Sequence, residues 1–330
     1  MAIRYKFILL FLLLVIFFFI DIICGSVSLP IGDVWAVLTG HSDNPIYKEI
    51  ILDHRLTKAI TAVLTGASLS VAGVLMQTMF HNPLAGPDVL GVTSGAGLGV
   101  ALLTMGATFL PAWMLGGSAQ IVAAVLGAAL ILLLVIVASV KVPNTVSLLI
   151  VGIMFGYFTG AIVSVLQSVS DPETLKLFIN WTFGSLSSVG WDKLFILIPV
   201  TIVGIVMSML MQKQLNALLL GKNYAGGLGI SVPRLRLLII IATAILAGTS
   251  TAFTGPISFI GITMPHAARG IFRTSNHRIV FPASILCGAC VLLICDCLSQ
   301  ISLMHGLLPI NAVTALFGAP IICWIIIKKK

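Results

Sequence analysis

Long apolar runs that are almost free of charge constrain this chain more than any other feature of its sequence. Hydrophobic residues make up 59% of the 330 residues and charged residues only 8%. A soluble protein carries about 25% charged residues, so this chain could not cover its surface in water. The runs lack the two-residue alternation of strands, and backbone groups in lipid must bond within the protein. The sequence therefore predicts helices that span a bilayer.

The predicted fold is an all-α polytopic membrane protein, with residues 1–330 forming a single transmembrane domain. Each span needs roughly 20 mostly apolar residues, and about ten runs meet this need. They cover residues 4–24, 56–80, 87–107, 113–139, 146–169, 193–211, 234–254, 256–273, 281–300 and 309–327. An even number places both termini on one side of the membrane. Most of the 18 Lys and Arg residues fall on that side, which predicts that both termini are cytoplasmic.

Motifs of enzymes and of metal sites are missing from the sequence. It contains no H-E-x-x-H, no G-x-S-x-G and no G-x-x-x-x-G-K-[ST] phosphate loop. We therefore expect no catalytic residues and no cofactor, with any ATP hydrolysis on a partner chain. Cys287 and Cys290 form a Cys-x-x-Cys pair in an apolar run, but without a His or second pair at zinc spacing they indicate packing rather than a metal site. The topology explains the net charge of +8, so no nucleic-acid partner is expected.

Ionisable groups inside membrane spans are candidates for function. Asp21 and Asp296 are the acidic residues within the predicted spans, and both lie near outer ends, where we expect them to reach water. A proton-coupled carrier would need a carboxylate near the middle of the bilayer. This argues against an ion-coupled secondary transporter, although Na⁺ sites built from backbone carbonyls keep that alternative open.

Two glycine patterns stand out. In QKQLNALLLGKNYAGGLGISVPRLR, residues 212–236, an apolar stretch is ended by Gly221 and the chain breaks again before Pro233. Two short helices joined by a glycine, outside the bilayer, predict either a docking surface or an ordinary long connector, and Gly221 is expected to need a special φ or a close approach. Gly152, Gly156 and Gly160 form a ridge that predicts either close helix packing or a pore-lining helix.

A third pattern is the turn MFHNPLAGPDVLGVTSGAG, residues 79–97. Pro83 and Pro87 are expected to stop two helices, while Asn82 and Asp88 can bond the freed backbone groups. The pattern therefore predicts a short, rigid turn between two helices.

The sequence resembles the FecCD-type permease family of ABC importers for iron–siderophore complexes, haem and cobalamin. The resemblance is carried by HRLTKAITAVLTGASLSVAGVLMQTMFHNPLAGPDVLGVTSGAG, LNALLLGKNYAGGLGISVPRLR, GPISFIGITMPHAARGIFRTSNHR and LLPINAVTALFGAPIICWII. It implies a multi-pass subunit of the cell inner (cytoplasmic) membrane. The implied partners are a second permease copy, a pair of cytoplasmic ATP-binding subunits, an extracytoplasmic substrate-binding protein and the lipid bilayer.

The resemblance also implies roles for particular residues. Segment 213–232 would be the coupling segment where an ATPase docks, through Leu215, Asn216, Leu220, Gly221, Ala225, Leu228 and Gly229. The translocation path would be lined by segments 146–169, 171–180 and 309–327, with path and gate residues Asn144, Thr145, Val146, Gly152, Gly156 and Gly160. Arg55 and Lys58 would be exposed cations that dock the binding protein or, alternatively, anchor to lipid headgroups. The family often has Arg-x-Pro-Arg at this point, and here the proline is absent.

Overall fold

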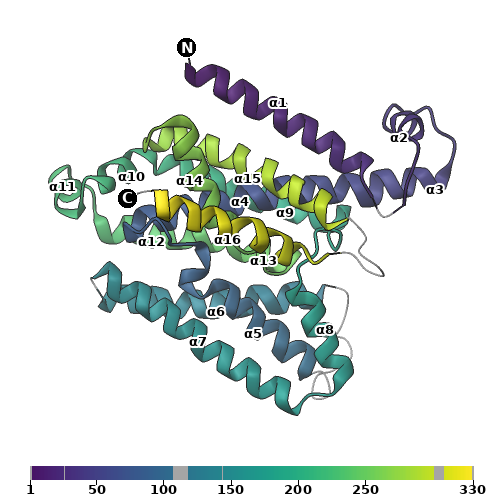
Figure 1. Ribbon diagram of the computed structural model, residues 1–330. Helices are drawn as coiled ribbons and strands as arrows, with labels where there is room; N and C mark the ends of the chain where they lie inside the picture. Colours follow the sequence, from purple (N-terminus) through teal and green to yellow (C-terminus); the bar gives the residue numbers. More distant parts are fainter. Residues whose placement is uncertain (1, 26, 107–117, 143, 301–307, 329–330) are drawn as a thin grey trace.

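The computed structural model describes residues 2–25, 27–106, 118–142, 144–300 and 308–328, and these residues form helices without strands (Figure 1). The helices longer than ten residues are α1 (Ala2–Ile23), α4 (Leu56–Phe80), α5 (Val92–Met105), α6 (Ala119–Lys141), α7 (Thr145–Val169), α8 (Pro172–Thr182), α9 (Trp191–Leu210), α12 (Val232–Thr243), α14 (Ile260–Phe272), α15 (His277–Ser299) and α16 (Ile310–Lys328). The shorter ones are α2 (Ile31–Leu38), α3 (Pro45–Lys48), η1 (Glu49–Arg55), η2 (Pro87–Leu90), α10 (Gln212–Leu219), α11 (Lys222–Gly227), η5 (Ala244–Gly248) and α13 (Thr249–Thr254).

The all-helical fold is as predicted, whereas the count of about ten spans stays a prediction. Within the described ranges, 7 helical segments are long and apolar enough to cross a membrane. Helices α5, with 14 residues, and α14, with 13, are shorter than their predicted spans. The first is shortened because η2 and the left-handed Gly91 precede it. The second begins only after Phe259, which is itself left-handed.

Helix α4 lies at the centre of the bundle and is buried along nearly its whole length. Its small residues allow this position, because neighbouring backbones approach it directly. A Cβ added at Gly66 would lie 2.3 Å from the Gly288 carbonyl oxygen of α15, and one at Gly73 only 1.6 Å from that of Gly261 in α14. Helices α14 and α15 therefore cross α4 at points where a side chain has no room.

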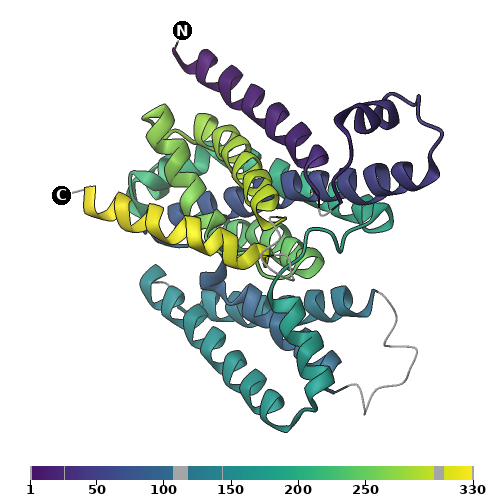
Figure 2. The same cartoon turned by 45° about the vertical axis from the view of Figure 1, so that its right-hand side comes forward.

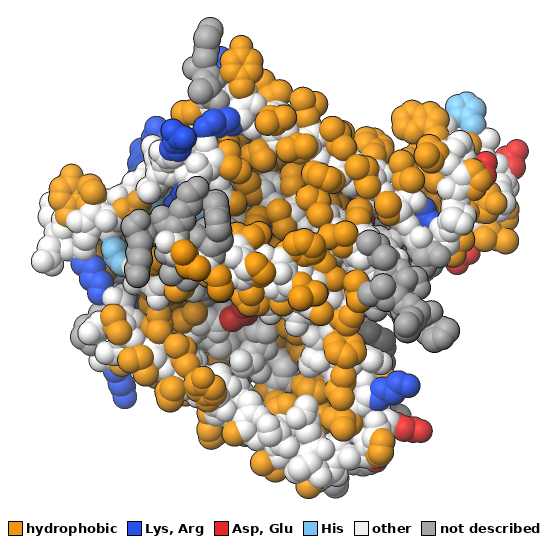
Figure 3. All heavy atoms as spheres, in the orientation of Figure 1, with side chains coloured by type: hydrophobic (Ala, Val, Ile, Leu, Met, Phe, Trp, Pro, Cys, Tyr) orange, Lys and Arg blue, Asp and Glu red, His pale blue; other side chains and the backbone are white. Residues whose placement is uncertain are grey.

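Helices α5 to α8 form a second layer below the group around α4, as Figures 1 and 2 both show. The two termini and the pair α10–α11 lie at one end of the bundle, which we name the coupling end, while α2 and α3 lie at the other (Figure 1). On the face drawn in Figure 3, apolar side chains cover the middle, and most of the visible Lys and Arg side chains gather at the coupling end. This distribution matches a bundle whose middle contacts lipid and whose ends contact water.

Candidate functional site

The predicted coupling segment folds as two short helices joined at a glycine. Helix α10 ends at Leu219 and α11 begins at Lys222. Between them Gly221 has φ 111° and ψ 155°, a region that is essentially restricted to glycine. The space beside Gly221 is open, so its requirement is conformational and does not come from a close approach. Gly229, after α11, is also left-handed, with φ 79°.

The coupling segment has an anchored face and an exposed face. Leu215 and Ala225 are fully buried against the bundle. Leu220 and Leu228 are 67% and 59% exposed, and Tyr224 is also exposed. An apolar surface of this kind at a water-facing end is typical of a protein docking site.

Asn216 fastens α10 to the start of α15. Its Oδ1 accepts hydrogen bonds from the backbone N–H of His277, at 2.9 Å, and from the ring Nδ1 of His277, at 2.7 Å. Its Nδ2 donates to Oδ1 of Asn276 at 3.0 Å. The ring of His277 also lies 2.9 Å from the hydroxyl of Thr78 in α4. The sequence pattern had not connected Asn276 and His277 with the coupling segment, because 60 residues separate them from Asn216.

The predicted gate residues lie at the start of α7. Asn144 caps the helix, with Oδ1 accepting the Val146 N–H at 2.9 Å, and Val146 is exposed. Thr145 accepts a hydrogen bond from the Nζ of Lys222, in α11, at 3.1 Å. The coupling segment and the predicted gate are therefore in direct contact through one side-chain pair.

Two cations, Lys222 and Arg236, lie close together at this contact. Burial and the nearby charge of Arg236 lower the pKa of Lys222 from its usual value. Arg236 itself donates to the carbonyl of Val142, at 3.0 Å, just before α7. Val142, at the end of α6, is thus held to α12, while the start of α7 is held to α11.

The three glycines of the α7 ridge do not share one environment. A Cβ at Gly152 would lie 2.2 Å from the carbonyl oxygen of Val89, so η2 crosses α7 there. At Gly156 the nearest atom is the hydroxyl of Ser94, at 3.4 Å, and at Gly160 nothing lies within 4 Å. Of these three glycines, only Gly152 is required by packing within this chain, because η2 crosses α7 at that turn alone. A path role for all three glycines stays a prediction.

The expectation that Arg55 and Lys58 are exposed cations is wrong. They are only 4% and 6% exposed. Arg55 donates to the carbonyl oxygens of Ile22 at 3.0 Å and Ile23 at 2.8 Å, at the end of α1, and to that of Val27 at 2.5 Å, beyond the helix. A docking role for these two residues finds no support in this geometry.

Asp21 and Asp296 were expected to reach water, and this too is wrong. Both are buried. The Nζ of Lys58 lies 2.7 Å from Oδ2 of Asp296 and 4.0 Å from Oδ1 of Asp21. Gln300 donates from Nε2 to both carboxylates, at 3.0 and 3.3 Å. Asp21, Lys58 and Asp296, here called the Asp–Lys–Asp cluster, join α1, α4 and α15.

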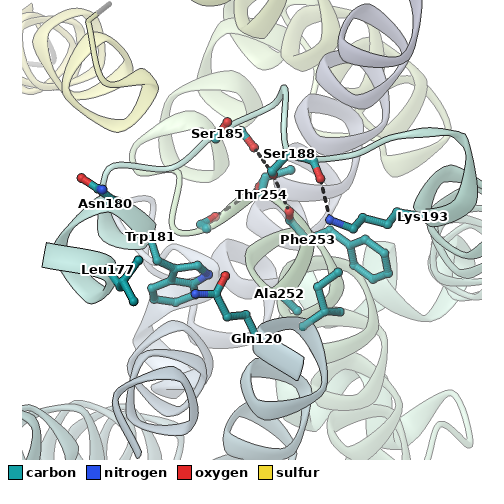
Figure 4. A pocket seen from close by; sticks show the side chains of 12 residues that line it. Gln120, Leu177, Asn180, Trp181, Ser185, Ser188, Lys193, Ala252, Phe253 and Thr254 are labelled. Atoms are coloured by element: carbon teal, nitrogen blue, oxygen red, sulfur yellow. Dashed lines mark hydrogen bonds between the residues drawn. The ribbon is translucent and has the colours of Figure 1, made fainter. Parts of the chain in front are cut away.

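A cavity of about 270 Å³ lies beside α8, whose residues 171–180 were predicted to line the path (Figure 4). Leu177 and Trp181 of α8 form one wall, and the end of α13 forms another. Lys193 donates to the Ser188 carbonyl at 2.7 Å across its rim. The lining thus combines polar backbone groups, the amine of Lys193 and the aromatic ring of Trp181.

The turn at residues 81–87 behaves largely as its sequence predicts. Helix α4 ends at Phe80, with His81 left-handed, and the Asn82 side chain accepts the Leu84 N–H at 2.9 Å. The carbonyl of Pro83 accepts from His266 at 2.7 Å, which ties the turn to α14. Asp88 differs from the prediction, because it accepts a hydrogen bond from the hydroxyl of Thr93.

Comparison with known proteins extends these observations to the whole chain. The sequence model of the FecCD transport family matches residues 13–328. The hemin transport system permease protein HmuU of Yersinia pestis is 34% identical over 307 residues, which cover 93% of this chain and 90% of HmuU. The vitamin B12 import system permease protein BtuC of Vibrio cholerae is 35% identical over 304 residues, covering 91% and 89%.

A solved structure gives the same result for the fold. An inward-facing conformation of a metal-chelate type ABC transporter superposes with a TM-score of 0.86 at 29% identity, and the match covers 98% of this chain and 99% of that one. The family match spans the positions of the coupling segment, the predicted gate and the Asp–Lys–Asp cluster, so it does not depend on one motif. The chain is a membrane permease subunit rather than an enzyme, and it belongs to the FecCD transport family of ABC transporter permeases.

Proposed function

We propose that this chain is the permease of an importer that carries an iron complex, such as a ferric siderophore or haem, or cobalamin across the cell inner membrane. The names of the relatives support this range of cargo, since they include haem, vitamin B12 and ferric dicitrate systems. In the proposed assembly two copies pair around the path and about ten helical segments of each lie in the membrane. The pair works with two cytoplasmic ATP-binding subunits and an extracytoplasmic binding protein.

The orientation proposed for the chain places the coupling end in the cytoplasm. Both described ends of the chain lie at that end, together with α10 and α11 (Figure 1). Lys213, Lys222, Arg234 and Arg278 belong to segments there, as the positive-inside rule requires.

The coupling mechanism proposed here depends on one contact above all, the hydrogen bond from Lys222 to Thr145. An ATPase that docks on Leu220 and Leu228 and moves on binding ATP would displace α11. Because Lys222 holds the first turn of α7, this displacement would reach the gate residues directly. Rigid-body shifts of packed helices are the usual way in which such movements open a path to alternating sides.

Uptake into proteoliposomes tests this function. The permease is reconstituted with and without its ATPase, and accumulation of haem, a ferric siderophore and cobalamin is measured after addition of ATP. We expect uptake of one of the three, only when the ATPase and ATP are both present. Uptake driven by an ion gradient in vesicles that lack the ATPase would refute the proposal and restore the secondary-transporter alternative.

A further inference from the structure

A cavity of about 580 Å³ opens at the coupling end, beside the coupling segment. Its walls come from five places in the chain, namely the end of α4, the turn after it, the end of α10, the second half of α14 and the connection from α14 to α15. Leu219 of the coupling segment forms one wall, and Gly270 of α14 lies at an exposed edge. The cavity is large enough for side chains of a partner, and any protein docked on the coupling segment would cover it.

Arg269 makes this cavity electrostatically unusual. Its guanidinium lines the cavity and donates from Nη1 to the side-chain oxygen of Gln77. The ion pairs described for this chain both belong to the Asp–Lys–Asp cluster at the other end, so within the described residues Arg269 has no carboxylate partner. A largely buried cation without a counter-charge is costly. The geometry therefore favours an anion brought in from outside.

The other polar walls reinforce this preference. His81 and His266 both line the cavity, and their Nε2 atoms lie 2.9 Å and 2.7 Å from the carbonyl oxygens of Leu218 and Pro83. A carbonyl oxygen can only accept a hydrogen bond, so each ring is protonated at Nε2. None of the described lining residues is Asp or Glu. The described lining thus carries the positive charge of Arg269, with no acidic group to compete for it.

We propose that this cavity receives an acidic side chain of the ATPase, which pairs with Arg269 when the ATPase docks on the coupling segment. The exposed apolar residues Leu220 and Leu228 belong to the segment whose Leu219 lines the cavity, and Arg269 gives the cavity a positive charge. Apolar contacts would then supply the area of the interface, and the Arg269 pair would set its register and specificity. This inference rests on the proposed coupling function.

Binding of the ATPase subunit to the permease in nanodiscs tests the pair. Arg269→Gln removes the charge but keeps a polar donor at this position, and we expect the dissociation constant of the ATPase to rise about 30-fold or more, with a weaker dependence on salt. Arg269→Lys should retain most of the affinity. Arg278→Gln, which removes an exposed cation at the same end, is the matched control and should change the affinity less than threefold.

Cysteine labelling gives a second readout that does not depend on the stability of the Arg269 variants. Gly270 is exposed, and a Cβ added there would meet no atom within 4 Å; the same holds for Gly32 at the opposite end. Gly270→Cys is therefore the probe and Gly32→Cys its control. In a Cys323→Ser background, the ATPase should slow maleimide labelling at residue 270 at least tenfold and leave residue 32 unaffected. Permease alone in phosphatidylglycerol nanodiscs should label at residue 270 as fast as in phosphatidylcholine.

The binding and labelling measurements together decide the inference. Loss of affinity in Arg269→Gln together with protection at residue 270 supports it. Unchanged affinity in Arg269→Gln overturns it, and so does protection by phosphatidylglycerol alone, which would make a lipid headgroup the occupant. Leu220→Asp separates the two proposals: if it abolishes ATPase binding while Arg269→Gln does not, only the present inference fails, and if neither has an effect the coupling assignment fails as well.

Discussion

Removal of the positive charge from the Asp–Lys–Asp cluster should destabilise the protein more than most single substitutions. Lys58→Met keeps the aliphatic length of the side chain but leaves Asp21 and Asp296 buried around the amide of Gln300. The lost contact is short, 2.7 Å from Nζ to Oδ2, and one oxygen of Asp21 already lacks a hydrogen-bond partner among the described residues. Removing one partner of a buried ion pair costs about 3–5 kcal/mol.

The double variant Lys58→Met with Asp296→Asn isolates the charge effect. Asn preserves the shape of Asp296 and can still bond to Gln300, so we expect at least half of the lost stability to return. Lys48→Met, which removes an exposed lysine at the same end, should change the stability by less than about 0.5 kcal/mol. The measurement is the free energy of unfolding in mixed micelles, with the Tm as a second readout.

Two results would contradict the predicted loss of stability in Lys58→Met. A loss below about 1 kcal/mol in Lys58→Met would mean that the cluster is hydrated or that its charges are screened, contrary to the burial described. A double variant no more stable than the single one would show that lost packing, and not an unpaired carboxylate, caused the effect. Because Arg55 and Lys58 are both buried, reversing both to Glu should prevent folding.

Three further predictions concern the helices. Gly73→Ala places a methyl group 1.6 Å from a carbonyl oxygen of α14 and should cost at least about 1–3 kcal/mol of stability, whereas Gly160→Ala meets open space and should be neutral in the same unfolding assay. Gly221→Val should uncouple ATP hydrolysis from uptake, because the backbone there suits glycine only; Gly227→Val, in open space with an ordinary φ, should keep the two activities coupled, and equal behaviour of the pair would contradict this. Lys222→Met should lower the ratio of uptake to ATP hydrolysed without weakening ATPase binding, and an unchanged ratio would rule out the proposed contact with the gate.

Much of the coupling segment was predictable from the sequence because its determinants are local. The apolar stretch LNALLL, the glycine after it and the second break specify helix, turn and helix within a few residues. The stop of α4 before Asn82 and Pro83 is local in the same sense, since a proline and an Asn side chain act on the backbone next to them. The membrane class followed from composition alone.

The environment of the charged residues was decided only by the tertiary structure. A sequence pattern places Arg55 and Lys58 three residues apart near a helix start, where exposure is a reasonable expectation. Their burial depends on α1 and α15, which supply Asp21 and Asp296 from positions far away in the chain. The register in which three helices meet is a long-range property, and no local pattern contains it.

The same distinction holds for Gly152 and for the basic cavity. Three equally spaced glycines look alike in sequence, but η2 crosses α7 at Gly152 alone. In sequence, Arg269 is one of many cations near the ends of apolar runs; in the structure α4, α10 and α14 surround it, and none of the described residues lining its cavity is acidic. The sequence by itself determined the helices, the membrane and the family, because composition and short motifs carry that information. Whether a charged side chain meets a carboxylate depends on how distant segments of the chain pack, so only the tertiary structure decided it.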